Sequence, residues 1–416
     1  SGRVQTRTDA LRDVNKLTKK IEMDNSFIRA ASRSGLVNEY YFSSKLAQVA
    51  RMRQEGAGII NLGIGSPDMA PAPEVIAELT QCASLITSHG YQGYRGIPAL
   101  RKAFAEWYAR YFSTILDPDT EILPLMGSKE GIMHISMAFI DPGDEVLVPD
   151  PGYPAYAAAA TLAGGVVRKY DLTDENGWLP DMDAIEAAVN ERVKIMWINY
   201  PHMPTGAGAT RQLFEKLVIF SQKHRILLCS DNPYSFILNN DHLSILSIPG
   251  AAETALELNS LSKSHNMAGW RIGMLAGNKS YINTVLRIKS NMDSGMFLPL
   301  QAAAAVALAL PDSWYAGLNE VYSRRRRYVE ELMNELGCSF NSSQSGLFLW
   351  GRIPGRYRDA EEMTEELLHS RHLFVTPGSV FGENGRRYIR ISLCADEEQL
   401  SMALGRVRER VDTKQI

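Results

Sequence analysis

One pattern repeats along the chain from about Asp119 to Gly277: a short apolar run rich in β-branched residues, then a turn, then a helical stretch. Such alternation is typical of an α/β fold in which helices join parallel strands. The sequence therefore predicts a mostly parallel sheet covered by helices on both faces. Strands are expected at Ile122–Met126, Glu145–Val148, Val166–Tyr170, Lys194–Ile198, Ile226–Ser230, Thr254–Asn259 and Ile272–Ala276, and helices between them at Lys129–Ile140, Met182–Asn190 and Arg211–Lys223.

The pattern changes after Pro311 to one long charged helix followed by short strands and a further helix. A chain of 416 residues exceeds the roughly 250–300 residues at which one hydrophobic core stops growing, so two domains are expected. We predict a large domain over residues 60–300. A smaller α+β domain would take residues 301–416 together with residues 1–59, a polar segment that has no core pattern of its own.

The balance of charges bears on possible partners. The chain has 44 basic and 47 acidic residues, a formal net charge of -3, so no overall field favours nucleic acid or an anionic membrane. The longest apolar run, Ala302–Leu310, is far shorter than the roughly 20 residues of a membrane span. The four cysteines form no C-x-x-C pair and no secretory leader precedes them, which favours a reducing cytoplasm. Small-molecule partners are expected.

Two potentially reactive side chains follow apolar runs. Asp231 ends the run that begins at Ile226, and Lys263 follows the run that ends at Ser260. Ligands of parallel sheets bind at the carboxyl ends of the strands, where these residues would lie. Asp231 could instead cap a helix, and Lys263 could be an ordinary surface lysine. The presence of both, with Arg271 eight residues after Lys263, favours a site for an anion beside an amine.

Three further segments carry candidate binding groups. The strand that ends in Gly127-Ser-Lys-Glu-Gly131 opens a helix, so free N–H groups would face an anion, although such glycine-rich turns are weak signals alone. Tyr153 follows another strand, where its ring could stack on a flat heterocycle or simply pack in a turn. Arg390 alternates with Ile389 and Ile391 and would be partly buried, ready for a carboxylate or for a structural salt bridge.

In this order the motifs, from Asn61-Leu-Gly-Ile-Gly-Ser-Pro-Asp68 to Arg390, resemble those of the class I/II aminotransferases, which are fold type I pyridoxal 5′-phosphate enzymes. The resemblance covers most of the chain. It implies a homodimer that transfers an amino group from an L-amino acid to a 2-oxo acid by a ping-pong mechanism. The residues implied are then the following: Lys263 for the Schiff base and proton transfer, Asp231 for the ring nitrogen, Tyr234 for the 3′-oxygen, Tyr153 for ring stacking, Ser128, Lys129, Ser260 and Arg271 for the phosphate, Tyr91 for the phosphate of the neighbouring subunit, and Gly65 and Arg390 for the substrate carboxylate.

One residue departs from the family pattern. The family usually has asparagine directly before Pro-Thr-Gly, where it donates to the 3′-oxygen, but this chain has Met203. Methionine has no such donor, so the pKa of the Schiff base should be higher than in relatives with asparagine. Asn199, four residues earlier, is included among the cofactor-binding residues because it could compensate if the loop shifts.

Several alternatives remain open from the sequence. The same scaffold hosts carbon–sulfur β-lyases and other α-carbanion chemistry, because the cofactor carries the electron sink. A non-catalytic regulator is disfavoured, since no helix-turn-helix pattern precedes the domain. The pair His369 and His372 has no third ligand nearby, so no metal site is expected. The substrate is undefined. Its side chain is expected to contact Tyr40, Tyr41, Phe297 and Phe348, and no arginine lies between Ser290 and Leu298 for a second carboxylate.

Overall fold

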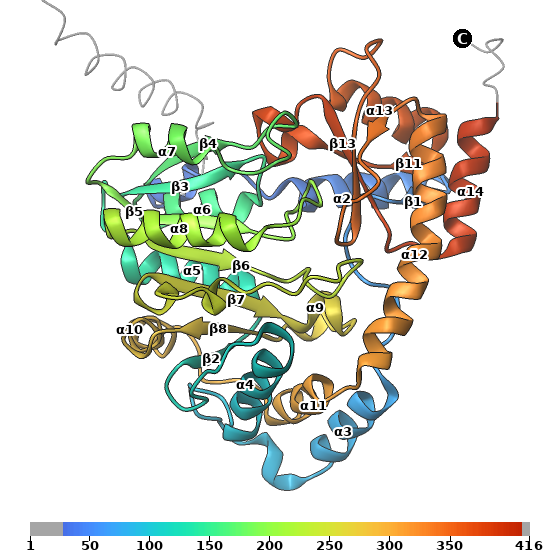
Figure 1. The fold of residues 1–416 in the computed structure, drawn as a ribbon. Helices are drawn as coiled ribbons and strands as arrows, with labels where there is room; N and C mark the ends of the chain where they lie inside the picture. Colours follow the sequence, from blue (N-terminus) through green and yellow to red (C-terminus); the bar gives the residue numbers. More distant parts are fainter. Residues whose placement is uncertain (1–27, 410–416) are drawn as a thin grey trace, which may run out of the picture.

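The computed structural model describes residues 28–409 and has a seven-stranded central sheet in the order β2-β8-β7-β6-β5-β3-β4 (Figure 1). Only β8 runs antiparallel to its neighbours, so the predicted mostly parallel sheet is confirmed. The observed strands agree with the predicted ones to within two residues. They are β2 (Ile122–Leu125), β3 (Glu145–Asp150), β4 (Val166–Asp171), β5 (Val193–Asn199), β6 (Leu227–Asp231), β7 (Ala255–Ser260) and β8 (Gly273–Gly277).

Helices cover both faces of this sheet, as the alternating pattern predicts. Along β5, Ile195 and Trp197 belong to the core beneath one group of helices, whereas Met196 and Ile198 belong to the core on the opposite face. Successive strand residues point to opposite faces, so a strand buried on both faces must be apolar throughout. The first group is α5 (Ser128–Phe139), α6 (Pro154–Leu162) and α10 (Lys279–Lys289), and the second is α7 (Met182–Ala188) and α8 (Arg211–His224) (Figure 1).

A third group of helices packs beyond the β2 edge of the sheet. It contains α3 (Pro73–Ala83), α4 (Pro98–Phe112) and α11 (Leu298–Leu308), and α11 contacts both of the others. The Ala-rich run of α11 permits this close packing, with Ala303, Ala304 and Ala307 fully buried. The predicted domain boundary at residue 300 falls inside α11. The division into residues 60–300 and residues 1–59 with 301–416 therefore stays a prediction.

The remaining elements form a smaller α+β layer. An antiparallel sheet has the order β12-β13-β10-β9, with β9 (Ser339–Phe340), β10 (Phe348–Arg352), β12 (Thr376–Pro377) and β13 (Tyr388–Ser392). A parallel pair joins β1 (Ile60–Asn61) to β11 (Leu373–Phe374). Its helices are α2 (Tyr41–Gln54), α12 (Asp312–Glu335), α13 (Ala360–Arg371) and α14 (Glu397–Arg408), with short 3₁₀ helices at Gly378–Phe381 and Glu383–Gly385. Elsewhere in the described chain are α9 (Leu261–Ser264), which follows β7, and 3₁₀ helices at Ser32–Gly35, Ile86–His89, Ile245–Ser247, Ala251–Glu253 and Ala268–Trp270.

The long helix α12 connects the two parts of the molecule (Figure 1). Near its start, the Trp314 indole donates to the carbonyl of Ser264 in α9, at 2.9 Å. Further along, Arg325 makes a bidentate ion pair with Asp68, at 2.6 and 2.8 Å. The helix then packs against α14. A single rigid element therefore touches the turn that carries Lys263, the loop before α3 and the smaller sheet.

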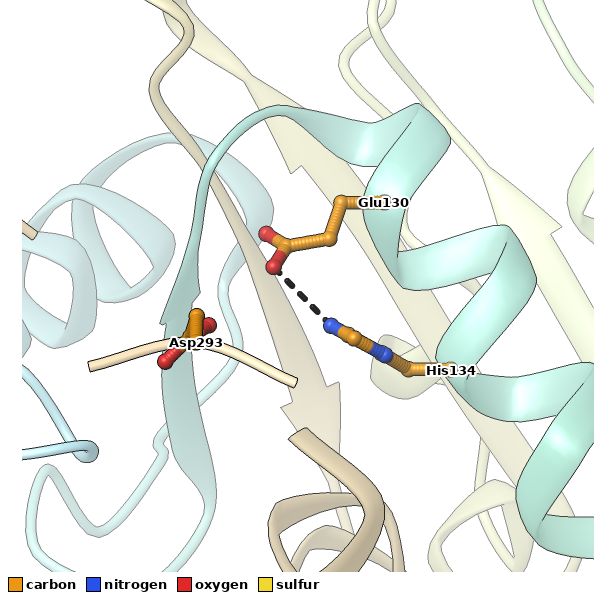
Figure 2. Close-up of side chains that lie close together, drawn as sticks. All are labelled: Glu130, His134 and Asp293. Atoms are coloured by element: carbon orange, nitrogen blue, oxygen red, sulfur yellow. Dashed lines mark hydrogen bonds and ion pairs between the residues drawn. The ribbon is translucent and has the colours of Figure 1, made fainter. Parts of the chain in front are cut away.

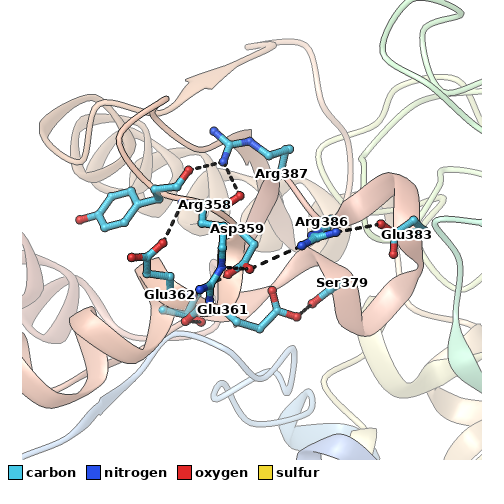
Figure 3. Close-up of polar contacts among 10 residues, drawn as sticks. Arg358, Asp359, Glu361, Glu362, Ser379, Glu383, Arg386 and Arg387 are labelled. Atoms are coloured by element: carbon cyan, nitrogen blue, oxygen red, sulfur yellow. Dashed lines mark hydrogen bonds and ion pairs between the residues drawn. The ribbon is translucent and has the colours of Figure 1, made fainter.

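A polar cluster fixes the start of α13 and the chain that leads into β13 (Figure 3). Asp359 caps α13 by accepting from the backbone N–H of Glu362 at 3.0 Å, and its other oxygen accepts from Arg358 at 2.8 Å. Arg387 donates to the carbonyl of Arg358 at 2.9 Å. A carboxylate at the N-cap satisfies otherwise free N–H groups of a helix. The cluster holds the approach to Arg390 in place.

Two observations concern the ends of the chain and its apolar segments. The first 27 residues and residues 410–416 lie outside the described residues, so the predicted place of residues 1–59 in the smaller domain can be followed only from Ile28 onward. In that part, α2 packs Phe42 and Val49 into the core.

Over residues 28–409 no helix has the length and apolar character needed to cross a bilayer.

Candidate active site

A cavity of about 480 Å³ lies at the carboxyl ends of the central strands, between the two parts of the molecule. β5, β6 and β7 end at Asn199, Asp231 and Ser260, and all three residues line it. Ligand sites of open α/β sheets lie at this edge. Thirteen of the predicted site residues line the cavity: Tyr40, Gly65, Ser128, Lys129, Tyr153, Asn199, Asp231, Tyr234, Ser260, Lys263, Arg271, Phe348 and Arg390.

Lys263 lies in α9, one turn beyond β7, and its amine donates to the carbonyl of Gly65. No carboxylate pairs with this amine within residues 28–409. Burial lowers the pKa of Lys263 to about 8, and the nearby guanidinium groups of Arg390 and Arg271 act in the same direction. A substantial fraction of the amine is therefore neutral near physiological pH, which a nucleophilic or basic lysine requires.

Asp231 ends β6 and is buried. One carboxylate oxygen, Oδ2, accepts a hydrogen bond of 2.8 Å from the Tyr156 hydroxyl, while Oδ1 has no partner among the described residues. Burial raises the pKa of Asp231 to about 7, the Tyr156 hydrogen bond opposes this, and the charge of Glu257 adds to it. An unpartnered buried oxygen is costly unless a ligand supplies the donor. Asp231 therefore awaits a donor or a positive charge.

The turn before α5 forms a cradle for an anion. Gly127 has a φ of +87°, and a Cβ at this position would lie 2.0 Å from Nη2 of Arg271. The missing side chain thus lets the guanidinium lie across the first turn of the helix. Ser128 begins the helix, and its buried Oγ has no partner among the described residues. Free N–H groups, a hydroxyl and a guanidinium together suit a phosphate group.

A largely buried polar cluster of Glu130, His134 and Asp293 lies next to this turn (Figure 2). Glu130 accepts from the backbone N–H of Met126 and also bonds His134 Nε2, at 2.9 Å. Asp293 lies beside them, and its Oδ2 accepts from buried Lys289 at 2.6 Å. The spacing of Glu130, His134 and Asp293 would allow a metal ion. Lys289 already supplies a positive charge, and we interpret the cluster as a structural tie between the turn and the chain around residue 293.

Arg390 lies on β13 in an aromatic setting. The Phe348 ring centroid lies 3.9 Å from its guanidinium carbon and that of Phe381 lies 4.7 Å away. Nη2 donates to the carbonyl of Gly63 at 2.7 Å, and Nη1 lies 3.2 Å from the sulfur of Met203. Burial lowers the pKa of Arg390 to about 10. No acidic side chain within residues 28–409 pairs with it, so the salt-bridge alternative does not describe this site.

Asn199 lines the cavity and hydrogen-bonds the backbone of both Met203 and Asp231. Its Oδ1 accepts from the backbone N–H of Met203 at 2.8 Å, and its Nδ2 donates to the carbonyl of Asp231 at 2.6 Å. The amide oxygen and one of the two Nδ2 hydrogens are therefore engaged by the backbone. Asn199 and Tyr234 both line the cavity, and their roles toward a ligand oxygen stay predictions.

Three predicted residues lie outside the cavity. Tyr91 is 93% exposed, and Phe297 is also exposed and lies beside the His89 ring. Tyr41 lines a neighbouring apolar groove, while Tyr40 lines the cavity itself. Adjacent residues at the start of a helix point about 100° apart, so only one of two consecutive tyrosines can face the site. The sequence does not show which of the two tyrosines faces the cavity, because it does not define how this end of the helix is rotated about its axis.

Tyr156 also lines the cavity, and no role for it was predicted from the sequence. It lies in the first turn of α6, three residues after Tyr153. Residues three apart share a helix face, so the second tyrosine of Tyr153-Pro-Ala-Tyr156 was the available signal. It was missed because its acidic partner, Asp231, is 75 residues away in the sequence.

Within residues 28–409, the cavity holds an amine and a guanidinium that no carboxylate neutralises, beside a cradle suited to an anion. Such a site suits an enzyme that binds an anionic cofactor and substrate. The aminotransferase class I and II family model matches residues 57–407, and the chain belongs to this family. Its cofactor is pyridoxal 5′-phosphate, and it transfers amino groups between amino acids and 2-oxo acids in amino acid metabolism. The resemblance inferred from the sequence is confirmed.

Curated relatives and solved structures agree with this assignment. The LL-diaminopimelate aminotransferase of Oleidesulfovibrio alaskensis is 41% identical over 91% of this chain and 98% of its own, and that of Aquifex aeolicus is 42% identical over 87% and 95%. Among solved structures, substrate-bound BacF from Bacillus subtilis has a TM-score of 0.88 and 33% identity, covering 91% of this chain and 97% of its own. A Thermus thermophilus aspartate aminotransferase mutant has a TM-score of 0.85 and 27% identity, covering 91% and 99%.

The residues present fit the cofactor. The Ser128 hydroxyl and Asp231 Oδ1 are both buried without a partner among residues 28–409, and the cofactor offers a phosphate and a protonated ring nitrogen to meet them. Gly127 leaves room for Arg271 beside that phosphate. When bound, the cofactor supplies an electron sink that accepts the electron pair left on the substrate α-carbon.

Replacing Arg390 by lysine is expected to raise the KM for amino donors by roughly 10- to 100-fold, with a much smaller change in kcat. Lysine keeps the charge but loses the planar, two-pronged geometry that matches a carboxylate. Steady-state kinetics with the holoenzyme measures this. Arg386→Lys is the matched control, because Arg386 is exposed and pairs with Glu383 at the surface. Equal KM values for Arg390→Lys and wild type would contradict the assignment.

Replacing Met203 by asparagine should lower, by about one unit, the pH at which the visible absorbance of the bound cofactor titrates. An amide donor at this position would stabilise negative charge on the 3′-oxygen, and the methionine side chain has no such donor. Met203→Leu is the control, since leucine has similar bulk and no donor. The expectation fails if asparagine and leucine leave the same midpoint.

Proposed function

We propose that this aminotransferase acts on an amino donor with a second charged group, of the diaminopimelate type, with Lys263 as the Schiff-base lysine. The substrate proposal rests on a second cation at the cavity, the Lys129 amine, in addition to the Arg390 guanidinium. Lys129 lies at the mouth of the cavity, 4.4 Å from the Tyr40 ring centroid, and no carboxylate of residues 28–409 pairs with it. Curated relatives named LL-diaminopimelate aminotransferase support the same class.

The two cations divide the work of binding. Arg390 is enclosed by aromatic rings deep in the cavity and would hold the α-carboxylate together with the backbone near Gly65. Lys129 would meet the distal carboxylate. The pKa of Lys129 is lowered, first by burial and then by Arg271, so an arriving anion relieves an unfavourable environment. This route needs no arginine between Ser290 and Leu298.

The proposed catalytic groups divide the chemistry among them. Lys263 would take the proton from the substrate α-carbon and deliver it to carbon C4′ of the cofactor. Asp231 would hold the ring nitrogen of the cofactor protonated. Tyr153 would pack on the ring, and Tyr234 would donate to its 3′-oxygen. The backbone N–H groups of Ser128 and Lys129, at the start of α5, would face the phosphate together with Ser260 and Arg271. The Lys129 side chain stays free for the distal carboxylate. Asn199 would fix the backbone of Asp231.

The substrate proposal is tested by comparing amino donors in a single half-turnover, followed as the change in cofactor absorbance. LL-Diaminopimelate should react with a kcat/KM at least about 100-fold above that of L-lysine, which lacks the distal carboxylate. In Lys129→Met this preference should shrink, while donors without a distal carboxylate keep their rates. An unchanged preference in Lys129→Met would contradict the proposal.

We also propose a homodimer with shared active sites. Tyr91 is almost fully exposed and does not line its own cavity, which suits a side chain that completes a partner's phosphate site. Neighbouring exposed side chains such as Phe297 would be covered in the dimer. Sedimentation should give a dimer, and Tyr91→Ala should weaken cofactor binding. Tyr281→Ala, at a different surface, should not, and a monomeric active enzyme would refute the idea.

The proposed compartment is the cytoplasm. All four cysteines are free and buried, which suits a reducing environment. Fractionation of the source cells with antibody detection tests it, and recovery of the protein from the medium would contradict it.

A further inference from the structure

Tyr156 is held rigidly against the proposed catalytic aspartate. It is 1% exposed, and its ring stacks on the Trp197 indole with centroids 4.8 Å apart and planes 6° from parallel. Its hydroxyl donates to Oδ2 of Asp231 at 2.8 Å. Because the ring cannot turn away, this hydrogen bond has a fixed direction. Tyr156 therefore selects which oxygen of Asp231 is occupied and which is free.

The backbone of Asp231 is fixed as well. It pairs with Asn199 in register between β5 and β6, and its carbonyl accepts from Asn199 Nδ2 at 2.6 Å. With the main chain held by the sheet, the remaining freedom is rotation of the carboxylate. The Tyr156 hydroxyl removes that freedom and leaves Oδ1 as the unpartnered acceptor.

The other charged and titratable groups around Asp231 disfavour its ionised form or add no support to it. Glu257 on β7 is fully buried and raises the pKa of Asp231, while burial itself acts most strongly in the same direction. Tyr153 and Tyr234 face the same carboxylate from the cavity, and their own pKa values are raised, largely by burial. The Tyr156 hydrogen bond is the contribution that lowers the pKa of Asp231.

We propose that Tyr156 is a positioning residue for amino transfer: it keeps Asp231 ionised and turned so that Oδ1 meets the ring nitrogen of the cofactor. This inference rests on the role proposed above for Asp231. Tyr156 itself touches Asp231 and not the reacting atoms. Its loss should therefore act through the charge on the ring nitrogen and leave substrate binding largely intact.

The test uses the holoenzyme loaded with pyridoxal phosphate labelled with ¹⁵N in the ring, and follows the nitrogen chemical shift against pH. In Tyr156→Phe, which keeps the ring stacked on Trp197, the nitrogen should lose its proton at a pH lower by at least about one unit. The kcat should fall by roughly 10- to 100-fold, as is typical when a supporting hydrogen bond is removed, with KM changed less than about threefold.

Tyr170→Phe is the matched control. Tyr170 is also buried, and its hydroxyl donates to the carbonyl of Trp197 at 2.7 Å in the same sheet, but it does not reach Asp231. It should leave the nitrogen titration unchanged. An unchanged titration in Tyr156→Phe, or an equal shift in both variants, would overturn the proposal.

Asp231→Asn in the same measurement separates this proposal from the one it rests on. If Asp231→Asn shifts the nitrogen titration and Tyr156→Phe does not, only the role of Tyr156 fails. If Asp231→Asn also leaves the titration unchanged, the role of Asp231 fails and the inference falls with it.

Discussion

Lys263→Ala should lose at least about 10⁴-fold in kcat, because one side chain is proposed both to hold the cofactor and to carry the substrate proton. The anion cradle of Gly127, Ser128 and Arg271 does not depend on the lysine, so cofactor should still bind, although without a covalent link. Borohydride reduction followed by mass spectrometry should find the cofactor mass on Lys263 in wild type and none in the variant. Single half-turnovers by stopped-flow absorbance measure the rate.

The same lysine predicts a pH dependence for cofactor loading. Only the neutral amine forms the covalent link, and burial lowers the pKa of Lys263 to about 8. Raising the pH through 8 converts ammonium to amine, so the loading rate should rise up to about that pH and then level. A rise that continues towards pH 10.5 would contradict the lowered pKa. Lys279→Ala, at the exposed start of α10, is the control and should match wild type in loading and in turnover.

Asp231→Asn should lower kcat by about 10³-fold while changing cofactor affinity and KM much less. Asparagine has nearly the same shape but carries no charge, so it stabilises neither the protonated ring nitrogen nor the electron pair that the ring must accept. Steady-state kinetics with saturating cofactor measures the loss, and equilibrium dialysis measures the affinity.

Asp171→Asn provides the comparison for Asp231. Asp171 also ends a parallel strand, β4, but it is exposed and accepts from the side chain of Asn384 at 2.8 Å, outside the cavity. It should retain full activity. If Asp231→Asn lost affinity and kcat in equal measure, the carboxylate would be a binding group without a special part in the chemistry.

Much of the fold could be predicted from the sequence because the central sheet is buried on both faces. A strand such as β5 must then be apolar at successive positions, and turns bound it sharply. The antiparallel direction of β8 was not predicted, since an apolar run carries no sign of direction. The domain division was harder for a related reason: α11 is as apolar as a helix of either part, and only its contacts with α3 and α4 reveal its neighbours.

The site was predictable where a residue follows a strand end, and less so elsewhere. Asp231 and Lys263 could be identified because parallel strands bring their carboxyl ends to one edge. The stacking of Phe348 and Phe381 on Arg390 could not, because these residues approach from different strands and loops. The contacts of Asn199 with the backbone depend on the path of a loop, which side-chain chemistry alone does not define.

The enclosure of Arg390 also determines which amines the enzyme should not accept as substrates. Consider an amine that lacks a carboxylate, such as the diamine left when a diamino acid is decarboxylated. It would enter a pocket whose guanidinium contacts, among the described residues, a carbonyl, a thioether and aromatic rings but no carboxylate. Water would be displaced from that cation with no anion to replace it, at a cost of several kcal/mol. The enzyme should therefore accept amino acids, which carry a carboxylate, and should not react with diamines, even where both are present in the same cell.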